Sequence, residues 1–427
     1  PLSSVDELPE AYQKPIKILV LDEAFEATSC DLVYEVEGVT TPPSEVPGED
    51  CVGVSEVPAH PTRDHAPHII GLLNAPLNGQ GMVGINPYSN VLFAEIRKEF
   101  SNDDDFRDAQ LKLIVNVLDD DIRIANLSWG FPSELDNSRQ MKQVVEMLSN
   151  RLLIVAAAGN EAKALDAGCD ILPACLHDVA NLITVVGIDR DQNSPGLWRE
   201  GVVGTNTHPG FHVAAVADNV LSTLRDNQLG TLSGTSQAAP QVSATAALIF
   251  SAAAHYFPEI AAGDQVLSPK VVKDRIIYSS DLFRNLRPSI MGGRLNVSRA
   301  IDIANTQVVL KRPIEGSDTE TIEVAFSGSL IEPPSGNQLW CRQPDGTDKK
   351  YHWSNIRRLS YDPDRRRYVV FFHAAGTPPD ERVQAPLERI TDCKLSTKSN
   401  LAVLETEEGE VSFRLQDVID YTSAIFE

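Results

Sequence analysis

Four side chains of this sequence could together carry out nucleophilic catalysis. Asp22 directly follows the apolar run IKILVL, and His65 opens the segment HAPHIIGLL. Ser236 lies in SGTSQAAPQVSATAALI, and Asn160 ends the segment AAAGN. Peptide hydrolysis by a serine needs a hydroxyl, a base that takes its proton, an acid that orients the base, and donors for the oxyanion. These residue types supply all four parts.

Each of these residues also has an ordinary structural interpretation. Asp22 could be a turn or cap aspartate, His65 a surface or capping residue, and Asn160 a loop asparagine. Ser236 could be a helix N-cap. Small residues around Ser236 let backbones approach closely, and Pro240 fits the first turn of a helix that starts beside the serine. The amino end of that helix would favour negative charge on a bound substrate, so the serine segment favours catalysis.

The elements that would position these residues alternate along the first three hundred residues. Continuous apolar runs, typical of buried parallel strands, lie at 16–21, 90–96, 122–128, 152–160, 182–188 and 211–217. Segments with a helical pattern lie at 68–75, 104–118, 137–150, 236–254, 271–277 and 297–304. This alternation predicts an α/β fold with a mostly parallel central sheet and helices on both faces. Asp22 then lies at the carboxyl end of a strand, where such sheets build active sites.

The character of the sequence changes near Val308. Short strand-like runs follow, including TIEVAF, YVVFF, LAVLE and VSFRL, separated by turn signals such as PDGTD and PPSGN. We therefore expect a catalytic domain at 1–307 and a smaller, mostly β accessory domain at 308–427.

Together these motifs resemble the subtilase family, the subtilisin-like serine proteases. GTSQAAPQVSATAALI resembles the family's serine motif, AAAGNE its oxyanion segment, HAPHIIG its histidine motif and ILVLDEA its aspartate motif. The order Asp, His, Ser along the chain is the one known for subtilisin. IANLSWG and GGRLNVSRAI also match, so the resemblance spans about residues 15–305. It implies a serine endopeptidase with a triad of Asp22, His65 and Ser236, and with Asn160 as oxyanion donor.

The two motifs that hold the acid and the base depart from the family pattern. The usual Asp-Ser/Thr-Gly is Asp22-Glu23-Ala24 here, and the usual His-Gly-Thr-His is His65-Ala66-Pro67-His68. Because the catalytic side chains are kept, we expect activity, with a changed rate and pH optimum.

The resemblance also implies where a substrate binds. An extended peptide would pair with the segment Ser128-Trp129-Gly130-Phe131, and the primary pocket would lie beside Ala158, Gly159 and Glu161. The bulky Trp129 and Phe131 would narrow the pockets or make them strongly apolar. Glu161 would favour a basic substrate residue.

No cofactor is expected for the chemistry, but a structural calcium ion is one interpretation. Asp31 and Asn78 match positions that resemble a calcium site of the family, and oxygen ligands suit calcium. Both residues could equally be turn formers.

The six cysteines fall into local pairs: Cys30 with Cys51, Cys169 with Cys175, and Cys341 with Cys393. This pattern fits three disulfides and an oxidising compartment, which predicts a secreted or periplasmic protein. The alternative is six free thiols in a cytoplasmic protein.

Charge and hydropathy narrow the range of partners. The net charge is −23, which repels nucleic acid and anionic membranes. The longest apolar run, 244–254, is too short for a membrane span. The GxGxxG pattern at 79–84 follows a helix and precedes a strand, the reverse of a dinucleotide site. We expect a peptide or protein substrate, and a pro-segment or protein partner for the C-terminal domain. The alternative function is a non-catalytic peptide-binding or scaffold protein on a subtilase fold.

Overall fold

The computed structural model divides the chain into two compact units, Pro1–Val297 and Ser298–Glu427. The domain boundary predicted from the sequence, at Val308, lies later than this one and falls inside strand β15 (Thr306–Pro313). The prediction misses the start of this strand because Thr306 and Gln307 are polar and carry no strand signal. The residues described are 8–22, 32, 34–36, 39–41, 58–60, 63–79, 81–95, 121–132, 135–165, 168–261, 267–313, 321–332, 338–343, 345–363, 365–373, 387–395, 402–414 and 417–424.

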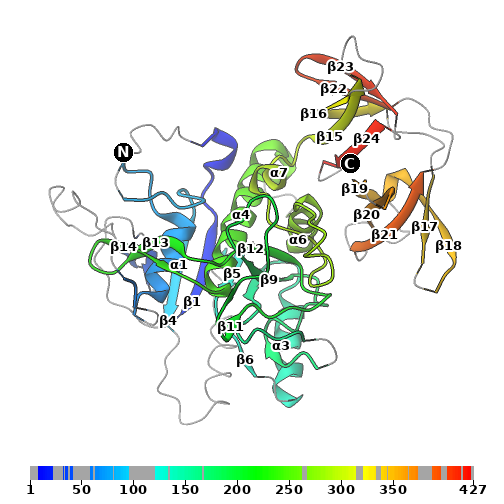
Figure 1. The fold of residues 1–427 in the computed structure, drawn as a ribbon. Helices are drawn as coiled ribbons and strands as arrows, with labels where there is room; N and C mark the ends of the chain where they lie inside the picture. Colours follow the sequence, from blue (N-terminus) through cyan, green and yellow to red (C-terminus); the bar gives the residue numbers. More distant parts are fainter. Residues whose placement is uncertain are drawn as a thin grey trace. The chain divides into compact units, whose positions relative to one another are not determined.

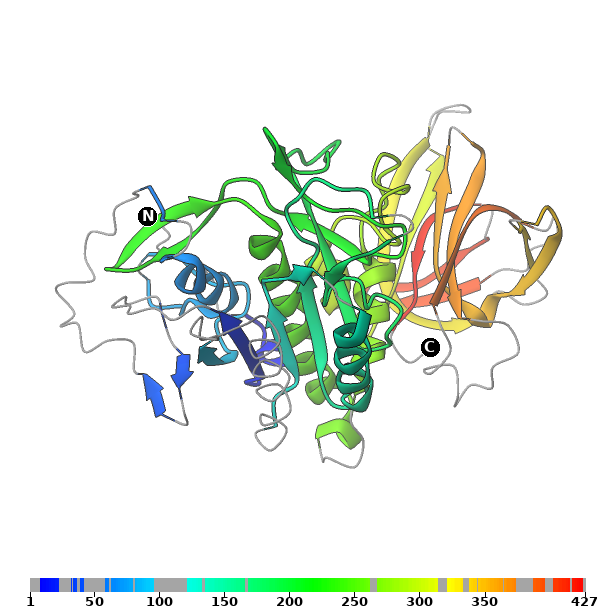
Figure 2. The same ribbon diagram turned by 90° about the horizontal axis from the view of Figure 1, so that it is seen from below.

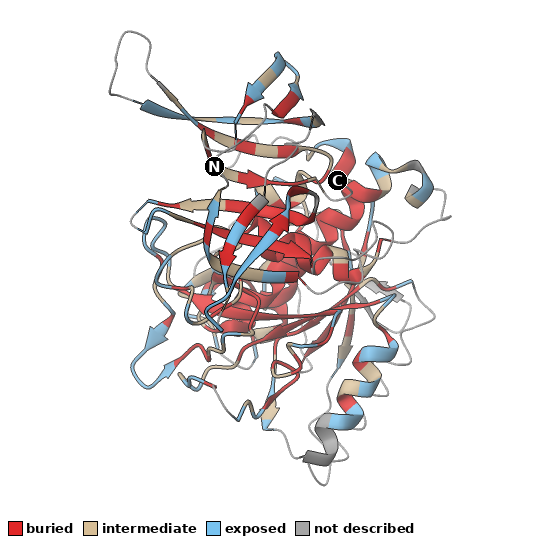
Figure 3. Cartoon of the chain, turned by 90° about the vertical axis from the view of Figure 1, so that its right-hand side faces the viewer, coloured by how far each residue is buried: buried red, intermediate tan, exposed pale blue. Residues whose placement is uncertain are grey.

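The first unit is built on an eight-stranded sheet with the order β12-β9-β7-β5-β1-β4-β2-β3. Strands β12, β9, β5, β1 and β4 are labelled in Figure 1. All neighbouring strands are parallel except β2 and β3, so the expected mostly parallel sheet is confirmed. Its strands are β1 (Lys17–Asp22), β2 (Tyr34–Val36), β3 (Val39–Thr41), β4 (Asn90–Glu95), β5 (Ile124–Leu127), β7 (Leu153–Ala157), β9 (Leu182–Ile188) and β12 (Val213–Val216). The central strands are buried along almost their whole length, as their continuous apolar runs predict (Figure 3).

Helices cover both faces of this sheet (Figure 2). On strand β5, Ala125 and Leu127 pack in a cluster with Met141 of helix α3 (Leu135–Met147). Between them, Asn126 accepts a hydrogen bond from Ser243 of helix α4 (Thr235–Tyr256), at 2.9 Å. Because side chains alternate along a strand, α3 and α4 lie on opposite faces of the sheet.

Helices α1 (His65–Asn74) and α6 (Pro269–Ser279) lie close to predicted segments, whereas the short helix α5 (Pro258–Ala261) was not predicted. The predicted helix at 104–118 lies outside the described residues. Three two-stranded sheets complete the unit: β6 (Phe131–Pro132) with β8 (Ile171–Leu172), β10 (Arg199–Glu200) with β11 (Val203–Gly204), and β13 (Val220–Leu224) with β14 (Gln228–Leu232). No helix in the described part of the chain is long and apolar enough to cross a bilayer.

The second unit begins with the end of helix α7 (Val297–Ile301) and is otherwise mostly antiparallel β structure. Ten strands form one sheet in the order β18-β17-β21-β20-β19-β24-β15-β16-β22-β23. Besides β15, they are β16 (Thr321–Glu332), β17 (Gln338–Arg342), β18 (Asp348–His352), β19 (Ile356–Asp362), β20 (Arg367–His373), β21 (Leu387–Leu395), β22 (Ala402–Thr406), β23 (Gly409–Phe413) and β24 (Val418–Thr422).

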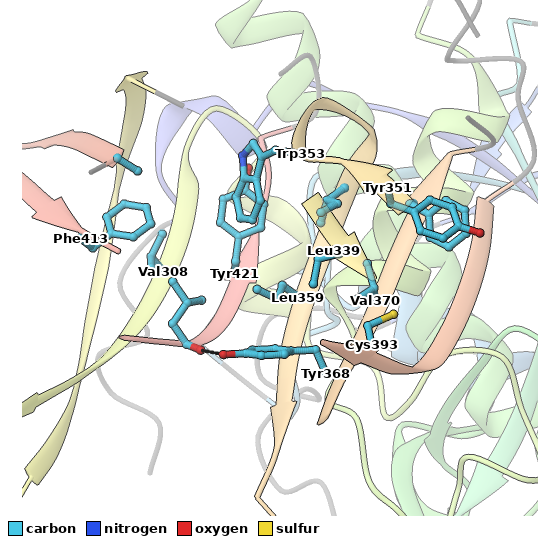
Figure 4. Close-up of a cluster of buried hydrophobic side chains, with 14 of the residues drawn as sticks. Val308, Leu339, Tyr351, Trp353, Leu359, Tyr368, Val370, Cys393, Phe413 and Tyr421 are labelled. Carbon is cyan, nitrogen blue, oxygen red and sulfur yellow. Dashed lines mark hydrogen bonds between the residues drawn. The ribbon is translucent and has the colours of Figure 1, made fainter. Parts of the chain in front are cut away.

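This sheet has its own hydrophobic core, rich in aromatic side chains (Figure 4). Tyr351 and Phe372 pack with ring centroids 4.1 Å apart, and Trp353 and Tyr421 pack at 4.6 Å. Since the core draws on strands from both ends of the sheet, the second unit can bury apolar surface by itself.

Candidate active site

Three neighbouring strands end at the same edge of the central sheet, and each has a residue predicted for the site at its end or just beyond it. Asp22 is the last residue of β1, Ser128 follows β5, and Asn160 lies three residues beyond β7. The strands are adjacent in the order β7-β5-β1. Because parallel strands place their carboxyl ends at one edge, the sheet brings the three segments together.

The aspartate and the histidine are hydrogen-bonded to each other. His65 Nδ1 lies 2.9 Å from both carboxylate oxygens of Asp22. The Asp22 side chain is only 3% exposed and that of His65 is 22% exposed. A carboxylate only accepts, so this contact selects the tautomer with the proton on Nδ1 and leaves Nε2 as the basic nitrogen.

Helix α1, which begins at His65, is held by the hairpin of β13 and β14. Thr223 Oγ1 donates to the Pro67 carbonyl at 2.8 Å, and Ser222 Oγ donates to the His68 carbonyl at 2.7 Å. Gly71 is needed for this close approach, because a Cβ there would lie 2.2 Å from Thr223 Oγ1. The contacts fix the helix whose first residue is the candidate base.

His68 supports the same packing and is chemically distinct from His65. Its side chain is fully buried, and Nε2 lies 2.8 Å from the carbonyl of Val220. Burial lowers the pKa of His68 to about 4, so the ring is neutral near pH 7 and donates from Nε2. This agrees with the supporting role that the sequence suggests for it.

Ser236 is the second residue of helix α4 and is joined to the segment after β5. Its Oγ donates to the Ser128 carbonyl at 2.8 Å, and Ser128 Oγ donates to the Ser236 carbonyl at 2.9 Å. Asn126 in turn donates to Ser128 Oγ at 2.9 Å. A hydroxyl has one proton, so Ser236 must release the Ser128 carbonyl before that proton can pass to a base.

The amide of Asn160 is oriented by the residue that precedes Ser236. Thr235 donates to Asn160 Oδ1 twice, from its backbone nitrogen at 2.9 Å and from Oγ1 at 2.8 Å. Thr235 Oγ1 also accepts from the backbone nitrogen of Gly159, at 3.2 Å. Because the amide oxygen is held in this way, Nδ2 is the donor that Asn160 can offer to a ligand.

The predicted substrate-pairing segment is anchored to the sheet and to a neighbouring loop. The indole nitrogen of Trp129 donates to the Leu21 carbonyl at 3.0 Å, and its ring stacks on Phe131 at 5.8 Å. Both rings pack against the hydrophobic cluster under helix α3. A Cβ at Gly130 would lie 3.0 Å from Ile171 Cγ2, so the loop after Cys169 closely supports this segment. That these rings narrow the pockets stays a prediction.

The residues that follow β7 are held by hydrogen bonds from Asn206, a residue that the sequence analysis did not identify. Asn206 is fully buried, and its Nδ2 donates to the Ala158 carbonyl at 3.1 Å and to a Glu161 carboxylate oxygen. Gly159 has φ of 93°, and a Cβ there would lie 2.5 Å from Asn206 Nδ2. Glycine is therefore required at this turn, and the exposed Glu161 carboxylate is oriented.

An ion pair beside the candidate base was also missed. Asp64, which precedes His65, accepts from Arg225 Nε at 3.0 Å and from the His60 backbone at 2.7 Å. Arg225 lies in the tight turn of the β13–β14 hairpin, where Asp226 and Asn227 have positive φ. The sequence Asp226-Asn227 between two runs with alternating apolar residues was a usable hairpin signal.

Two of the predicted disulfides are present, Cys169–Cys175 and Cys341–Cys393. Cys30 and Cys51 lie outside the described residues, as does Asp31 of the predicted calcium site. Its companion Asn78 is exposed, and the described residues hold no group of three or more histidine, cysteine, aspartate or glutamate side chains arranged for a metal. Calcium therefore stays a prediction and has no part in the chemistry below.

Comparisons with known proteins show what the chain as a whole is similar to. The chain is 26% identical over 268 residues to the major intracellular serine protease of Bacillus subtilis (strain 168), covering 58% of this chain and 76% of that protein. It is 30% identical over 203 residues to subtilisin Savinase of Lederbergia lenta, covering 46% of this chain and 68% of that protein. The A-subunit of the AB5 toxin from E. coli has a similar fold, with a TM-score of 0.50 at 20% identity over 67% of this chain and 92% of that chain.

A family model described as the subtilase family matches residues 13–298, about two thirds of the chain, and this range includes Asp22, His65, Asn160 and Ser236. The chain therefore belongs to the subtilase family of serine proteases.

Proposed function

We propose that this protein is a serine endopeptidase that hydrolyses peptide bonds through an acyl-enzyme formed on Ser236. The observation that carries the proposal is the hydrogen bond of His65 Nδ1 to the buried Asp22 carboxylate, at 2.9 Å. It makes Nε2 the basic nitrogen of His65, within a chain whose family hydrolyses peptide bonds by this chemistry.

The reaction begins when Ser236 Oγ leaves the Ser128 carbonyl and attacks the peptide carbonyl. His65 Nε2 takes the hydroxyl proton and later gives it to the leaving amine. Asp22 keeps the proton on Nδ1 and stabilises the imidazolium that forms. Asn160 Nδ2 and the backbone N–H of Ser236 bind the oxyanion. Water then attacks the acyl-enzyme by the same steps in reverse order, which releases the acid product and restores the serine.

The substrate lies extended along Ser128–Gly130, with its side chain next to the scissile bond beside Ala158 and Gly159. Glu161, exposed and oriented by Asn206, places a carboxylate at this position. It favours a basic substrate residue, which is also consistent with the protein's net charge of −23.

The two disulfides support an oxidising compartment, so we propose a secreted or periplasmic enzyme. One relative carries the name of an intracellular protease, which keeps a cytoplasmic location as the alternative.

The alternative function is a non-catalytic peptide-binding protein on the same fold. It predicts binding without turnover, although none of the four catalytic residue types is missing here.

A fluorophosphonate probe separates the two functions because it reacts only with an activated serine. We expect the folded protein to gain one adduct, located by mass spectrometry on the peptide that contains Ser236, and to lose hydrolysis of a chromogenic peptide in parallel. Protein unfolded in urea should not react, which is the control. An adduct on another serine would contradict the assignment of Ser236, and no adduct on the folded protein would favour the binding function.

A further inference from the structure

The end of the C-terminal sheet at strand β18 presents positive charge on an otherwise acidic protein. In the sheet order β18 is the terminal strand, and β17 is its one neighbour among the described residues. Lys349 and Lys350 lie next to each other on it and are both exposed. Since successive side chains of a strand point to opposite faces, the two ammonium groups flank this edge, which is unpaired among the described residues, on both sides.

Lys350 belongs to a row of three side chains that crosses three strands. Trp340 on β17 lies opposite Lys350 on β18 and opposite Lys394 on β21. Directly opposed residues share a face of the sheet, and strands are about 4.8 Å apart, so the indole lies between the two lysines. The neighbours Leu339 and Cys341 point into the core, which leaves Trp340 on the outer face. We call these three side chains the Trp340 row.

The charges of the Trp340 row are not neutralised within the described residues. Lys350 Nζ lies 4.4 Å above the Trp340 ring, and neither Lys350 nor Lys394 forms an ion pair there. Other charges on these strands are paired: Arg342 pairs with Asp348 at 3.3 Å, and Arg367 pairs with Asp392 at 2.9 Å. Within the described residues, the sheet thus carries these ion pairs beside two lysines that form none.

Protection of the sheet edge against aggregation explains only part of this pattern. Lysines on an edge strand do oppose pairing with another sheet. Lys394, however, lies on β21, which is paired on both sides. Trp340 is 41% exposed, a large apolar group left in water on the same face. Exposed tryptophan is enriched at binding surfaces, where its ring supplies contact area at low entropic cost.

We propose that the Trp340 row and the free edge of β18 bind an extended acidic peptide segment. Such a segment adds to the sheet as a further strand beside β18. Its residue opposite Lys350 lies on the face of the Trp340 row, and the next residue lies on the other face, opposite Lys349. Two adjacent carboxylates therefore match two adjacent lysines. An acidic segment is repelled by the rest of the protein, whose net charge is −23, and this repulsion directs it to the basic edge.

This inference rests on the proposed function in one respect: the segment is part of a protein substrate and lies away from the bond that is cut. The substrate class is then a protein with an exposed acidic stretch, held by the C-terminal unit while another part enters the active site. Holding both parts on one protein raises the effective concentration of the cleavage site.

The direct test is binding of a labelled peptide, measured by fluorescence anisotropy with the full-length protein. The probe is an eight-residue peptide with two adjacent glutamates between threonines and valines, and the control peptide has glutamines in their place. We expect the acidic peptide to bind and the control peptide to bind at least about tenfold more weakly. Added salt should weaken only the first. Equal binding of both peptides would overturn the proposal.

Variants then locate the site. Lys350→Glu with Lys394→Glu should lower the affinity for the acidic peptide by about tenfold or more, and Trp340→Ala by about threefold to tenfold. The matched control is Lys14→Glu with Lys311→Glu, because both are exposed lysines and the change in net charge is the same. It should change the affinity by less than about twofold. A similar loss in both double variants would reduce the effect to net charge and overturn the site.

Two further experimental outcomes would also contradict the proposed binding of an acidic peptide. If the charge-reversed variant self-associates on gel filtration while peptide affinity stays unchanged, the lysines only protect the edge and the proposal is wrong. If heparin binds to the Trp340 row but the acidic peptide does not, the ligand is an anionic polysaccharide and the proposal is also wrong.

Because anisotropy needs no peptide hydrolysis, a protein that binds the peptide but cleaves nothing would contradict the proposed function alone. An active protease without peptide binding would contradict this inference alone.

Discussion

The two compact units both bury polar side chains within hydrophobic cores, but they place them differently. In the first unit, buried polar side chains such as Asn126, Ser243 and Asn206 form hydrogen bonds to one another or to backbone beside the candidate active site. In the second unit, the hydrophobic cluster contains aromatic side chains such as Trp353 and Tyr421, and the buried Arg358 pairs with Asp420 at 2.7 Å. Buried polar groups are costly unless they are satisfied, so those of the first unit fix positions beside the candidate catalytic residues, while the Arg358–Asp420 pair joins strands β19 and β24 of the second unit.

This difference indicates which unit does chemistry. An oriented amide at Asn160 and an oriented imidazole at His65 depend on partners that are fixed in turn by other groups, namely Thr235 and Asp22. Preorganisation of this kind favours catalysis, because groups need not reorganise during the reaction. In the second unit, the unpaired charges lie instead on the surface, at the Trp340 row, where they suit binding. The predictions below test this division.

The largest expected effect comes from removing the nucleophile. Ser236→Ala should lower kcat by about 10⁶-fold, the magnitude known for the corresponding change in subtilisin. The variant should keep its melting temperature within a few degrees, because the lost hydroxyl makes a single hydrogen bond to the Ser128 carbonyl. Steady-state hydrolysis of a chromogenic peptide and thermal melting measure both quantities. Turnover near that of the unchanged protein would remove Ser236 from the mechanism.

The next effect concerns the oxyanion donor. Asn160→Ala should lower kcat by about 10²–10³-fold with little change in KM, as is known for the same donor in subtilisin, because its hydrogen bond forms mainly in the transition state. An effect on KM alone would instead assign Asn160 to substrate binding. Thr235→Val is the companion variant, since it removes one of the two bonds that orient the amide. It should cost a smaller part of kcat, and Thr235→Ser should restore it.

Some features of the fold and the candidate site can be located from the sequence, and others cannot. Long apolar runs and small-residue motifs are local signals, so strands β7 and β9, helix α4 and the residues Asp22 and Ser236 could all be located from them. The supporting residues Asn206 and Arg225 could not, because their partners Glu161 and Asp64 lie far away in the sequence. Only the folded chain brings such pairs together.

In the second unit, the change in pattern near Val308 predicts β structure, but not which strands are neighbours. The sheet places β15 beside β24, strands from the two ends of the unit, and such pairings carry no local signal. The exposed Trp340 illustrates the same limit. A tryptophan next to a cysteine in a strand-like run gives no sign of whether it points to the core or to solvent until the register with β18 and β21 is known.

A pH-dependent effect tests whether the polar interior of the first unit is fixed as described. His68 has a pKa of about 4 in the folded protein, against about 6.5 when unfolded. Between these values the unfolded chain takes up a proton that the folded chain does not, so stability is lost as pH falls from about 6.5 to about 4. The loss from this group is about 3 kcal/mol once pH reaches 4. Urea unfolding across this range measures it.

The comparison variant for that experiment is His68→Gln. Its amide can still donate to the Val220 carbonyl but does not titrate. The free-energy difference between the two proteins should therefore change with pH, with the unchanged protein losing more on acidification. Other buried histidines, such as His212, contribute equally to both proteins and cancel. Parallel pH profiles would show that His68 is not held neutral by burial.

The smallest expected effect comes from removing the second unit altogether. Every residue assigned to the chemistry lies between Asp22 and Ser236, and all strands of the central sheet lie before residue 217. The ten-stranded sheet has its own core, so its loss should leave the first interior intact. A chain of residues 1–305, which ends before β15, should hydrolyse a small chromogenic peptide within about twofold of the full chain, since it keeps the groups that act in the transition state. Hydrolysis of a protein substrate with an acidic stretch should fall, because the Trp340 row is gone.

The same truncation carrying Ser236→Ala is the control for contaminating proteases. A folded, soluble 1–305 without peptidase activity would mean that the β unit helps to form the active site, and the division between a catalytic and a binding unit would then be wrong.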